Sequence, residues 1–432
     1  MRSRGWRILG LCFGVHRALT VMYFGGVVVA GVLPPAFTIA TGALVSAVAA
    51  GGDGVWGALA IAGALYLAQH LLAPLQGHIG SALVQRVDED QAEQLMIALG
   101  EPPGLAHVED PATLDAIAKA QGTLVGATPG GAAGRLGAVW NLRLQGAISL
   151  VIVGSWRWWV PLALLPVYVL AFRVSGWHWR QVTEVMYGRT EAMRRSYYIR
   201  KLALSPAIAK ETRVFGLATW LVDRYRGGSL AVMREVWRRR SEGWLAAVGL
   251  YGLIAAAEAA VMIAVAGEAV AGELALGQAV VIAGAIAAAG GLAAYHDGHW
   301  YVDAAMDALD RLEALRQRAG ELGGVVGGTA AADELPRRTI RFEGVRFAYP
   351  GRGAPVFAEL DLEIEAGRSL AIVGENGAGK TTLVKLLARL YDPDAGRITV
   401  DGVDLRTLEP RSWHRRVAAI FQDFTQFELS AE

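Results

Sequence analysis

Long stretches without acidic or basic side chains dominate the first 300 residues of the chain. Residues 18–52, 55–85 and 274–296 contain no Asp, Glu, Lys or Arg, and three further apolar stretches carry one such residue each. A helix of about 20 apolar residues crosses the hydrocarbon core of a membrane, so all these stretches are long enough to span it. The pattern therefore predicts six membrane-spanning helices, at residues 18–50, 55–85, 136–156, 158–179, 243–266 and 274–296.

Three charged residues fall inside predicted spans, Arg143, Arg173 and Glu258, and the first and last of them call for an explanation. Arg143 and Glu258 would each cost about 2.5–3.5 kcal/mol if they faced lipid near the middle of the bilayer. One interpretation is that they line a polar translocation cavity, as partners of one another. The other is that Arg143 extends its charge toward the membrane surface and Glu258 makes one interhelical hydrogen bond. The sequence is compatible with both.

The charges of the connecting segments predict how the spans are oriented. Residues 173–240 hold 15 Lys or Arg against five Asp or Glu, whereas the short loops at residues 51–54 and 267–273 hold no Lys or Arg. Positive charge collects on the cytoplasmic side, so the two short loops are expected outside and both chain termini inside. The chain is therefore predicted to be an integral protein of the cell membrane, in contact with its lipids.

The pattern changes after residue 303. Residues 303–318 are charged at helical spacing, and residues 320–332 are rich in Gly and Ala, which is typical of a linker. Apolar and polar residues then alternate with period two, which predicts strands near residues 340–347, 360–364 and 397–400. Short apolar runs at residues 369–373 and 417–421 predict two further buried strands.

A glycine-rich sequence follows the run at residues 369–373 and fits the pattern G-x-x-x-x-G-K-[ST]. A helix is predicted directly after it, from Thr381 to Leu390. Glycines let backbone N–H groups surround phosphate oxygens, and the positive end of a helix adds to this attraction. Lys380 can reach the β- and γ-phosphates of a nucleotide, and the Thr381 hydroxyl can bind Mg²⁺. The candidate nucleotide-binding residues are Gly374, Glu375, Asn376, Gly377, Ala378, Gly379, Lys380, Thr381 and Thr382.

Composition narrows the remaining possibilities. The chain is 53% hydrophobic and 19% charged, with a net charge of +1, so no nucleic-acid partner is indicated. Cys12 is the only cysteine, which excludes an internal disulfide framework and a zinc site built from several thiolates.

Six spans joined to a phosphate-loop domain resemble a half-transporter of the ATP-binding cassette (ABC) exporter type. The resemblance implies that Tyr349, 25 residues before Gly374, stacks on the adenine of ATP. It implies that Gln422, 42 residues after Lys380, is the glutamine of the Q-loop, a catalytic residue that contacts Mg²⁺. Residues 107–114 and 210–216 resemble the two cytoplasmic loops that couple the domains of such exporters.

The resemblance implies an overall organisation and function. The expected fold is multi-domain: an all-α six-helix transmembrane bundle (residues 1–318), a linker (319–337) and a partial α/β P-loop nucleotide-binding domain (338–432). The expected function is ATP-driven export of a cargo by an ATPase-coupled dimer. ATP and Mg²⁺ are the expected cofactors, and a second half-transporter subunit, identical or different, is the expected partner. Drugs, lipids and peptides fit the bundle equally well as cargo.

The sequence also departs from the family pattern. The residues after Gln422 contain no LSGGQ-like signature, no Walker B carboxylates and no switch histidine. We therefore expect a truncated domain that binds Mg-ATP weakly and does not hydrolyse it, with Ile372, Val373 and Ile420 partly uncovered. A non-catalytic nucleotide-binding partner, or a truncated relic of a transporter, is the alternative. A membrane-anchored P-loop kinase or GTPase is less consistent with the sequence, because we find no N-K-x-D motif and six spans exceed what an anchor needs.

Overall fold

The computed structural model divides the chain into two compact units. Residues 1–91 and 121–309 form the first unit, and residues 92–120 and 310–432 form the second. The structure describes the whole chain except residues 1, 53, 111–112, 114–116, 118–127, 189, 296, 323–324, 326, 351–352 and 422–432.

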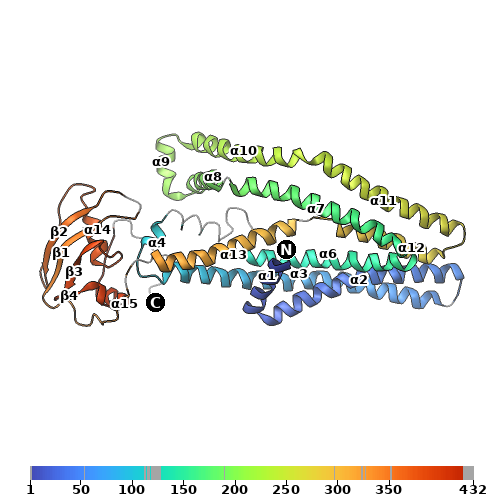
Figure 1. Cartoon of the computed structure of the whole chain (residues 1–432), viewed down its shortest axis with the longest axis horizontal. Helices are drawn as coiled ribbons and strands as arrows, with labels where there is room; N and C mark the ends of the chain where they lie inside the picture. Colours follow the sequence, from blue (N-terminus) through green and yellow to red (C-terminus); the bar gives the residue numbers. More distant parts are fainter. Residues whose placement is uncertain are drawn as a thin grey trace. The chain divides into compact units, whose positions relative to one another are not determined.

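The first unit is helical (Figure 1). Its helices are α1 (Arg2–Val15), α2 (Arg17–Ala50), most of α3 (Gly54–Gly100), α6 (Pro129–Trp156), α7 (Trp159–Gly188), α8 (Thr190–Ala203), η1 (Pro206–Ile208), α9 (Ala209–Val214), α10 (Ala218–Glu242), α11 (Trp244–Val270), α12 (Leu276–Ala289), η2 (Gly290–Leu292) and the start of α13 (Asp297–Leu322).

Helices occupy all six of the predicted apolar stretches. Five described helices are long and apolar enough to cross a membrane: α2, α3, α6, α7 and α11. The sixth stretch differs from the prediction, because residues 274–296 do not form one continuous helix. Here α12 ends at Ala289, and Gly290, Gly291 and Leu292 form the short helix η2. Glycine has a low helix propensity, so the two glycines make it easier for the chain to leave the α-helix at this point.

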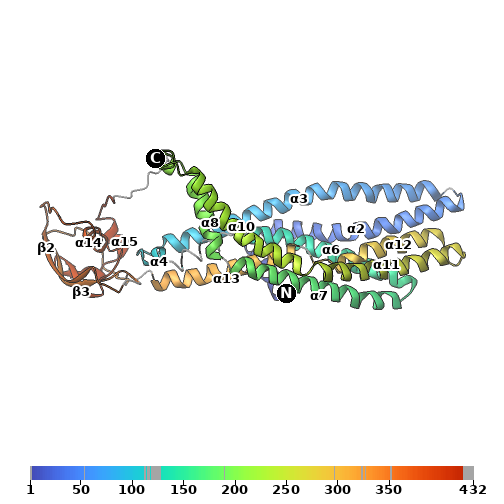
Figure 2. The same cartoon turned by 90° about the horizontal axis from the view of Figure 1, so that it is seen from above.

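The helices approach one another closely where glycine replaces a side chain. A Cβ added to Gly42 of α2 would lie 2.1 Å from Val281 Cγ2 and 2.5 Å from the carbonyl oxygen of Gly277 in α12. Close backbone approach at small residues is the usual way in which apolar helices associate in membranes. Figure 2 shows α3 at the edge of this bundle beside α2. Most residues of the most apolar stretch of α3 are not buried in the bundle.

The second unit is built on a four-stranded antiparallel sheet with the strand order β2-β1-β3-β4. The strands are β1 (Thr339–Phe347), β2 (Phe357–Glu365), β3 (Ala395–Val400) and β4 (Val403–Asp404). Helices α4 (Ala106–Glu109), α14 (Lys380–Leu387), η3 (Leu405–Thr407) and α15 (Pro410–His414) accompany it. Phe342, Leu386 and Trp413 are almost fully buried and belong to one hydrophobic core.

Two predicted strands are wrong. Residues 369–373 and 417–421 are not in strand conformation, and Val373 and Ile420 are 90% and 92% exposed. An apolar run forms a buried strand only where neighbouring strands bond to its edges, and these runs do not pair with β1 to β4. The expected exposure of Ile372, Val373 and Ile420 is confirmed. Helix α14 also ends at Leu387 rather than Leu390.

The contact between α2 and α12 generates a test with opposite signs at two glycines. Gly42→Ala forces a methyl group into Val281 and the Gly277 carbonyl, so overpacking should destabilise the protein by about 1–3 kcal/mol. Gly63→Ala in α3 meets no atom within 4 Å and should be neutral or stabilising by up to about 1 kcal/mol. Thermal unfolding in lipid nanodiscs measures both. Equal melting temperatures for the two variants would show that the glycine contact is not tight.

Candidate functional site

The predicted phosphate loop lies directly before α14, as the sequence pattern requires. Gly377 and Gly379 have φ angles of 88° and 93°, in the left-handed region that favours glycine. A Cβ on Gly379 would also lie 2.9 Å from Val356 Cγ1 and 3.0 Å from the Phe357 ring. The loop therefore needs glycine at position 379 for its conformation and for its packing.

Lys380 is the first residue of α14, and its side chain folds back over the loop. Its Nζ atom donates hydrogen bonds to the carbonyl oxygens of Gly374 (2.6 Å) and Glu375 (2.7 Å). The ammonium group thus lies within the loop that is expected to hold the phosphates. A phosphate would compete with these two carbonyl groups for the same charged donor.

Tyr349 lies beside the same helix, although 31 residues separate it from Lys380. The Tyr349 hydroxyl and the buried Thr382 hydroxyl are 3.1 Å apart and share a hydrogen bond. The structure therefore brings the predicted base-stacking residue and the predicted phosphate-binding residues together. Thr381 is exposed at the start of α14, whereas Gln422 lies outside the described residues.

A segment from between α3 and α6 also reaches this part of the second unit. Glu109, at the end of α4, accepts a hydrogen bond from Lys385 Nζ (2.8 Å) and another from the Tyr391 hydroxyl. The Leu105 N–H donates to the Leu390 carbonyl oxygen (3.0 Å). The Lys385 ammonium group in turn lies 5.3 Å from the centre of the Tyr349 ring. Glu109, inside the predicted coupling segment 107–114, is thus connected through Lys385 to Tyr349, the predicted base-stacking residue.

The protonation states of Lys385 and Tyr391 favour their hydrogen bonds to Glu109. Burial lowers the pKa of Lys385, but the hydrogen bond to Glu109 and the neighbouring charges outweigh burial, so the pKa is raised overall. Burial and then the hydrogen bond to Glu109 raise the pKa of the Tyr391 hydroxyl. At neutral pH the lysine is therefore charged and the tyrosine is protonated, and both can donate to the Glu109 carboxylate. Sequence reasoning missed this cluster, because nothing along the chain connects Glu109 with residues 276 or more positions later.

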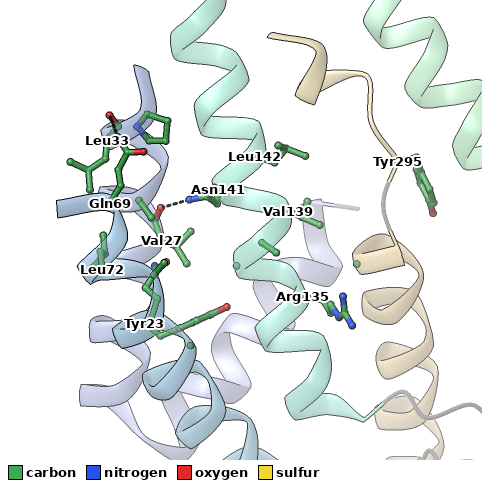
Figure 3. A pocket seen from close by; sticks show the side chains of 18 residues that line it. Tyr23, Val27, Leu33, Gln69, Leu72, Arg135, Val139, Asn141, Leu142 and Tyr295 are labelled. Atoms are coloured by element: carbon green, nitrogen blue, oxygen red, sulfur yellow. Dashed lines mark hydrogen bonds between the residues drawn. The ribbon is translucent and has the colours of Figure 1, made fainter. Parts of the chain in front are cut away.

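The first unit contains a cavity of about 840 Å³ between α2, α3, α6 and the start of α13. Figure 3 shows Asn141 of α6 bonded to the backbone of Val27 in α2, and Tyr295 on the coil that precedes α13. Most lining residues are apolar. The polar side chains that line it are Tyr23, Gln69, Gln76, Arg135, Asn141 and Tyr295.

Arg143 and Glu258 do not line this cavity. The Tyr168 hydroxyl donates a hydrogen bond to Glu258 (2.8 Å), so the interpretation of Glu258 as one half of an interhelical hydrogen bond fits the structure. Arg143 fits neither interpretation, because it donates to the carbonyl oxygens of Leu292 (2.5 Å) and Ala294 (3.4 Å). The two residues are not bonded to each other in the described part of the chain.

Comparison with known proteins supports the interpretation of residues 374–382 as a nucleotide-binding loop. Residues 357–431 match the family model described as ABC transporter. The beta-(1-->2)glucan export ATP-binding/permease protein NdvA of Brucella suis is 45% identical over 93 residues, which are 22% of this chain and 15% of that protein. The ATP-dependent lipid A-core flippase of Thiobacillus denitrificans is 44% identical over 88 residues, 20% of this chain and 15% of that protein. The matched segment thus spans about a seventh of the length of these relatives.

The fold has a known counterpart as well. A bacterial Atm1-family ABC exporter, solved with ATP bound, superposes with a TM-score of 0.63 over 93% of this chain and 70% of its own, at 21% sequence identity. The fold is therefore that of an ABC exporter, and residues 357–431 are similar to the ABC transporter family. The apolar helices indicate an integral membrane protein.

The Glu109 contact can be tested without any ligand. Glu109→Gln removes the carboxylate that faces Lys385, a partly buried ion pair worth about 1 kcal/mol. Amide hydrogen exchange at residues 105–109 should therefore become about fivefold faster. Glu363→Gln, which removes an exposed ion pair with Arg341 on the sheet, is the matched control and should leave these amides unchanged. Unchanged exchange in Glu109→Gln would show that the ion pair does not hold α4.

Proposed function

We propose that the protein is a subunit of an ATP-driven exporter. The observation that carries the proposal is the combination, in one chain, of a phosphate loop at the start of α14 with apolar helices that line a cavity. Binding of ATP at the loop would drive a change in the access of the cavity from one side of the membrane to the other. The relatives described above, an export permease and a lipid flippase, are consistent with this activity.

The nucleotide-binding residues have distinct roles in this proposal. Tyr349 stacks on the base, and the backbone N–H groups of residues 374–379 surround the phosphates. Lys380 exchanges the carbonyl oxygens of Gly374 and Glu375 for phosphate oxygens. The loop suits phosphate groups, because Gly377 and Gly379 adopt positive φ angles and the positive N-terminal end of α14 lies at the loop.

Magnesium would accompany the nucleotide rather than occupy a site of its own. Among the described residues, no group of three or more His, Cys, Asp or Glu side chains is placed to hold a metal ion. The Thr381 hydroxyl and the Gln422 amide oxygen would each supply one ligand, and phosphate oxygens and water would supply the others.

A second half-transporter subunit completes the proposed exporter, either another copy of this chain or a related one. Both termini lie in the cytoplasm, because the basic residues between 173 and 240 belong on that side and the short loops 51–54 and 267–273 on the other. This places the phosphate loop where ATP is available.

We further propose that the cavity binds the cargo, and that the cargo is an amphipathic molecule with negative charge. Among the described residues, Arg135 is the only charged side chain that lines the cavity. Its guanidinium lies over the Tyr301 ring, 5.0 Å from the ring centre, and no carboxylate of the described residues pairs with it. The Gln76 Nε2 atom is buried there without a hydrogen-bond partner among the described residues, so it offers a second donor. Apolar walls with two convergent donors suit an apolar molecule that carries an anionic group.

The coupling between nucleotide and cavity is the decisive test. In a Cys12→Ala background, Ala138→Cys places a thiol in the cavity wall. Mg-ATP should slow its modification by a water-soluble thiol reagent in proteoliposomes about tenfold or more, because closure changes access to the cavity. Lys380→Ala is the control, since loss of the phosphate-binding charge should abolish both ATP binding and the effect. If Mg-ATP does not change the rate of thiol modification at position 138 when Lys380 is intact, the proposal is wrong.

The sign of the cargo charge can be tested with the same thiol. An anionic and a cationic methanethiosulfonate of similar size should react with position 138 at a ratio that favours the anion. Arg135→Gln should lower that ratio about fivefold, as expected for one charge within a few ångströms in a wet cavity. Arg173→Gln, outside the cavity lining, is the matched control. No shift in the ratio on loss of Arg135 would remove the argument for an anionic cargo.

A further inference from the structure

Helices α12 and α13 are two parts of one interrupted path. After α12 ends at Ala289, η2 covers Gly290–Leu292, and residues 293–295 are not helical before α13 begins at Asp297. Figure 3 shows this break as a coil with Tyr295 on it. Tyr295 lines the cavity, and α13 continues from there past Leu309 into the residues of the second unit. The break therefore joins the cavity wall to the helix that leads toward the nucleotide-binding part of the chain.

A break of this kind leaves backbone carbonyl groups without helical partners. Such groups are tolerated in an apolar bundle only where other parts of the protein bond to them. Arg143 of α6 supplies the donors: its Nη1 and Nη2 atoms bond to the carbonyl oxygens of Leu292 and Ala294, one on each side of Ala293. The cost of placing an arginine inside the bundle is thus offset by the groups that it satisfies.

The packing around the break is fitted to it. The Arg143 guanidinium lies 4.3 Å from the centre of the Phe172 ring, which itself lies 5.6 Å from the Tyr295 ring. On α7, a Cβ at Gly176 would lie 3.0 Å from Tyr295 Cε2. On α6, a Cβ at Gly146 would lie 2.7 Å from Leu292 Cγ. Two glycines on two helices thus leave room for the chain at the break.

Glu258 approaches the same break from α11. A Cβ on Gly290 would lie 3.0 Å from Glu258 Oε1, the oxygen that accepts the Tyr168 hydrogen bond. Arg143 and Glu258, two of the three charged residues of the predicted spans, are therefore placed at one interruption of the bundle, although neither lines the cavity.

We propose that Arg143 is a positioning residue, which holds the interruption at residues 290–295 open and thereby keeps Tyr295 in the cavity wall. The interruption acts as a joint between α12 and α13. A cargo that contacts Tyr295 would act on this joint and hence on α13. The proposal goes beyond the proposed export activity, and its test uses neither ATP nor cargo, so the two can fail independently.

The first test is amide hydrogen exchange of the protein in lipid nanodiscs. Arg143→Met removes the donors but keeps an unbranched side chain, so exchange in the peptide that covers residues 290–296 should rise about tenfold or more. Exchange in α12 at residues 277–286 should stay the same. Arg135→Met removes another arginine of α6 that does not bond to the break, and it should change neither peptide. Arg143→Lys keeps the charge without the planar fork and should show an intermediate effect.

The second test asks whether Arg143 positions residue 295. In a Cys12→Ala background, the thiol of Tyr295→Cys should change its rate of modification about tenfold when Arg143→Met is added. The thiol of Ala138→Cys, elsewhere in the cavity wall, should not respond. If exchange and labelling rise alike throughout the bundle, or if Arg143→Met does not fold while Arg143→Lys matches the parent, Arg143 is only a structural support and the proposal is wrong. A faster exchange at residues 290–296 with unchanged labelling at 295 would also overturn the positioning role.

Discussion

A charged group inside a bundle of apolar helices is costly unless other parts of the protein bond to it, and this constraint shapes the first unit around Arg143 and Glu258. Arg143 satisfies two carbonyl groups freed by the break after α12, and Tyr168 satisfies Glu258. Glycines allow the necessary close approach, as at Gly42 and Gly277 between α2 and α12. Arg143 and Glu258, the candidates for a substrate path, thus bond to other parts of the bundle. The arginine that lines the cavity is Arg135.

The second unit links two features that the sequence keeps far apart. The phosphate loop and Tyr349 meet through a hydrogen bond to Thr382, and α4 reaches the same place through Glu109, Lys385 and Tyr391. A displacement of the nucleotide or of α4 would change the surroundings of Lys385 in either case. Tyr349 and the segment that connects α3 with α6 thus share Lys385 as a common neighbour.

Local patterns predicted much of this architecture, and their failures have a common cause. The six apolar stretches and the strands near residues 340, 360 and 397 lie where helices and strands occur. The apolar runs at residues 369–373 and 417–421 do not form strands, because strand formation depends on neighbours that pair with them and not on composition. The interruption of the last apolar stretch was missed for a related reason, since Gly290 and Gly291 break a helix only where Arg143 and the packing around it make the broken form acceptable.

The sequence by itself determined the apolar helices, the glycine-rich phosphate loop and the adjoining helix, because hydrophobic periodicity and backbone freedom are properties of neighbouring residues. Tertiary structure decided which residues act together. Arg143 meets Leu292 across 149 positions and Lys385 meets Glu109 across 276, and no local pattern records either pairing. The same arginine in an unbroken bundle would have no carbonyl groups to bind. Its role follows from the shape of the backbone opposite it, which only the folded chain provides.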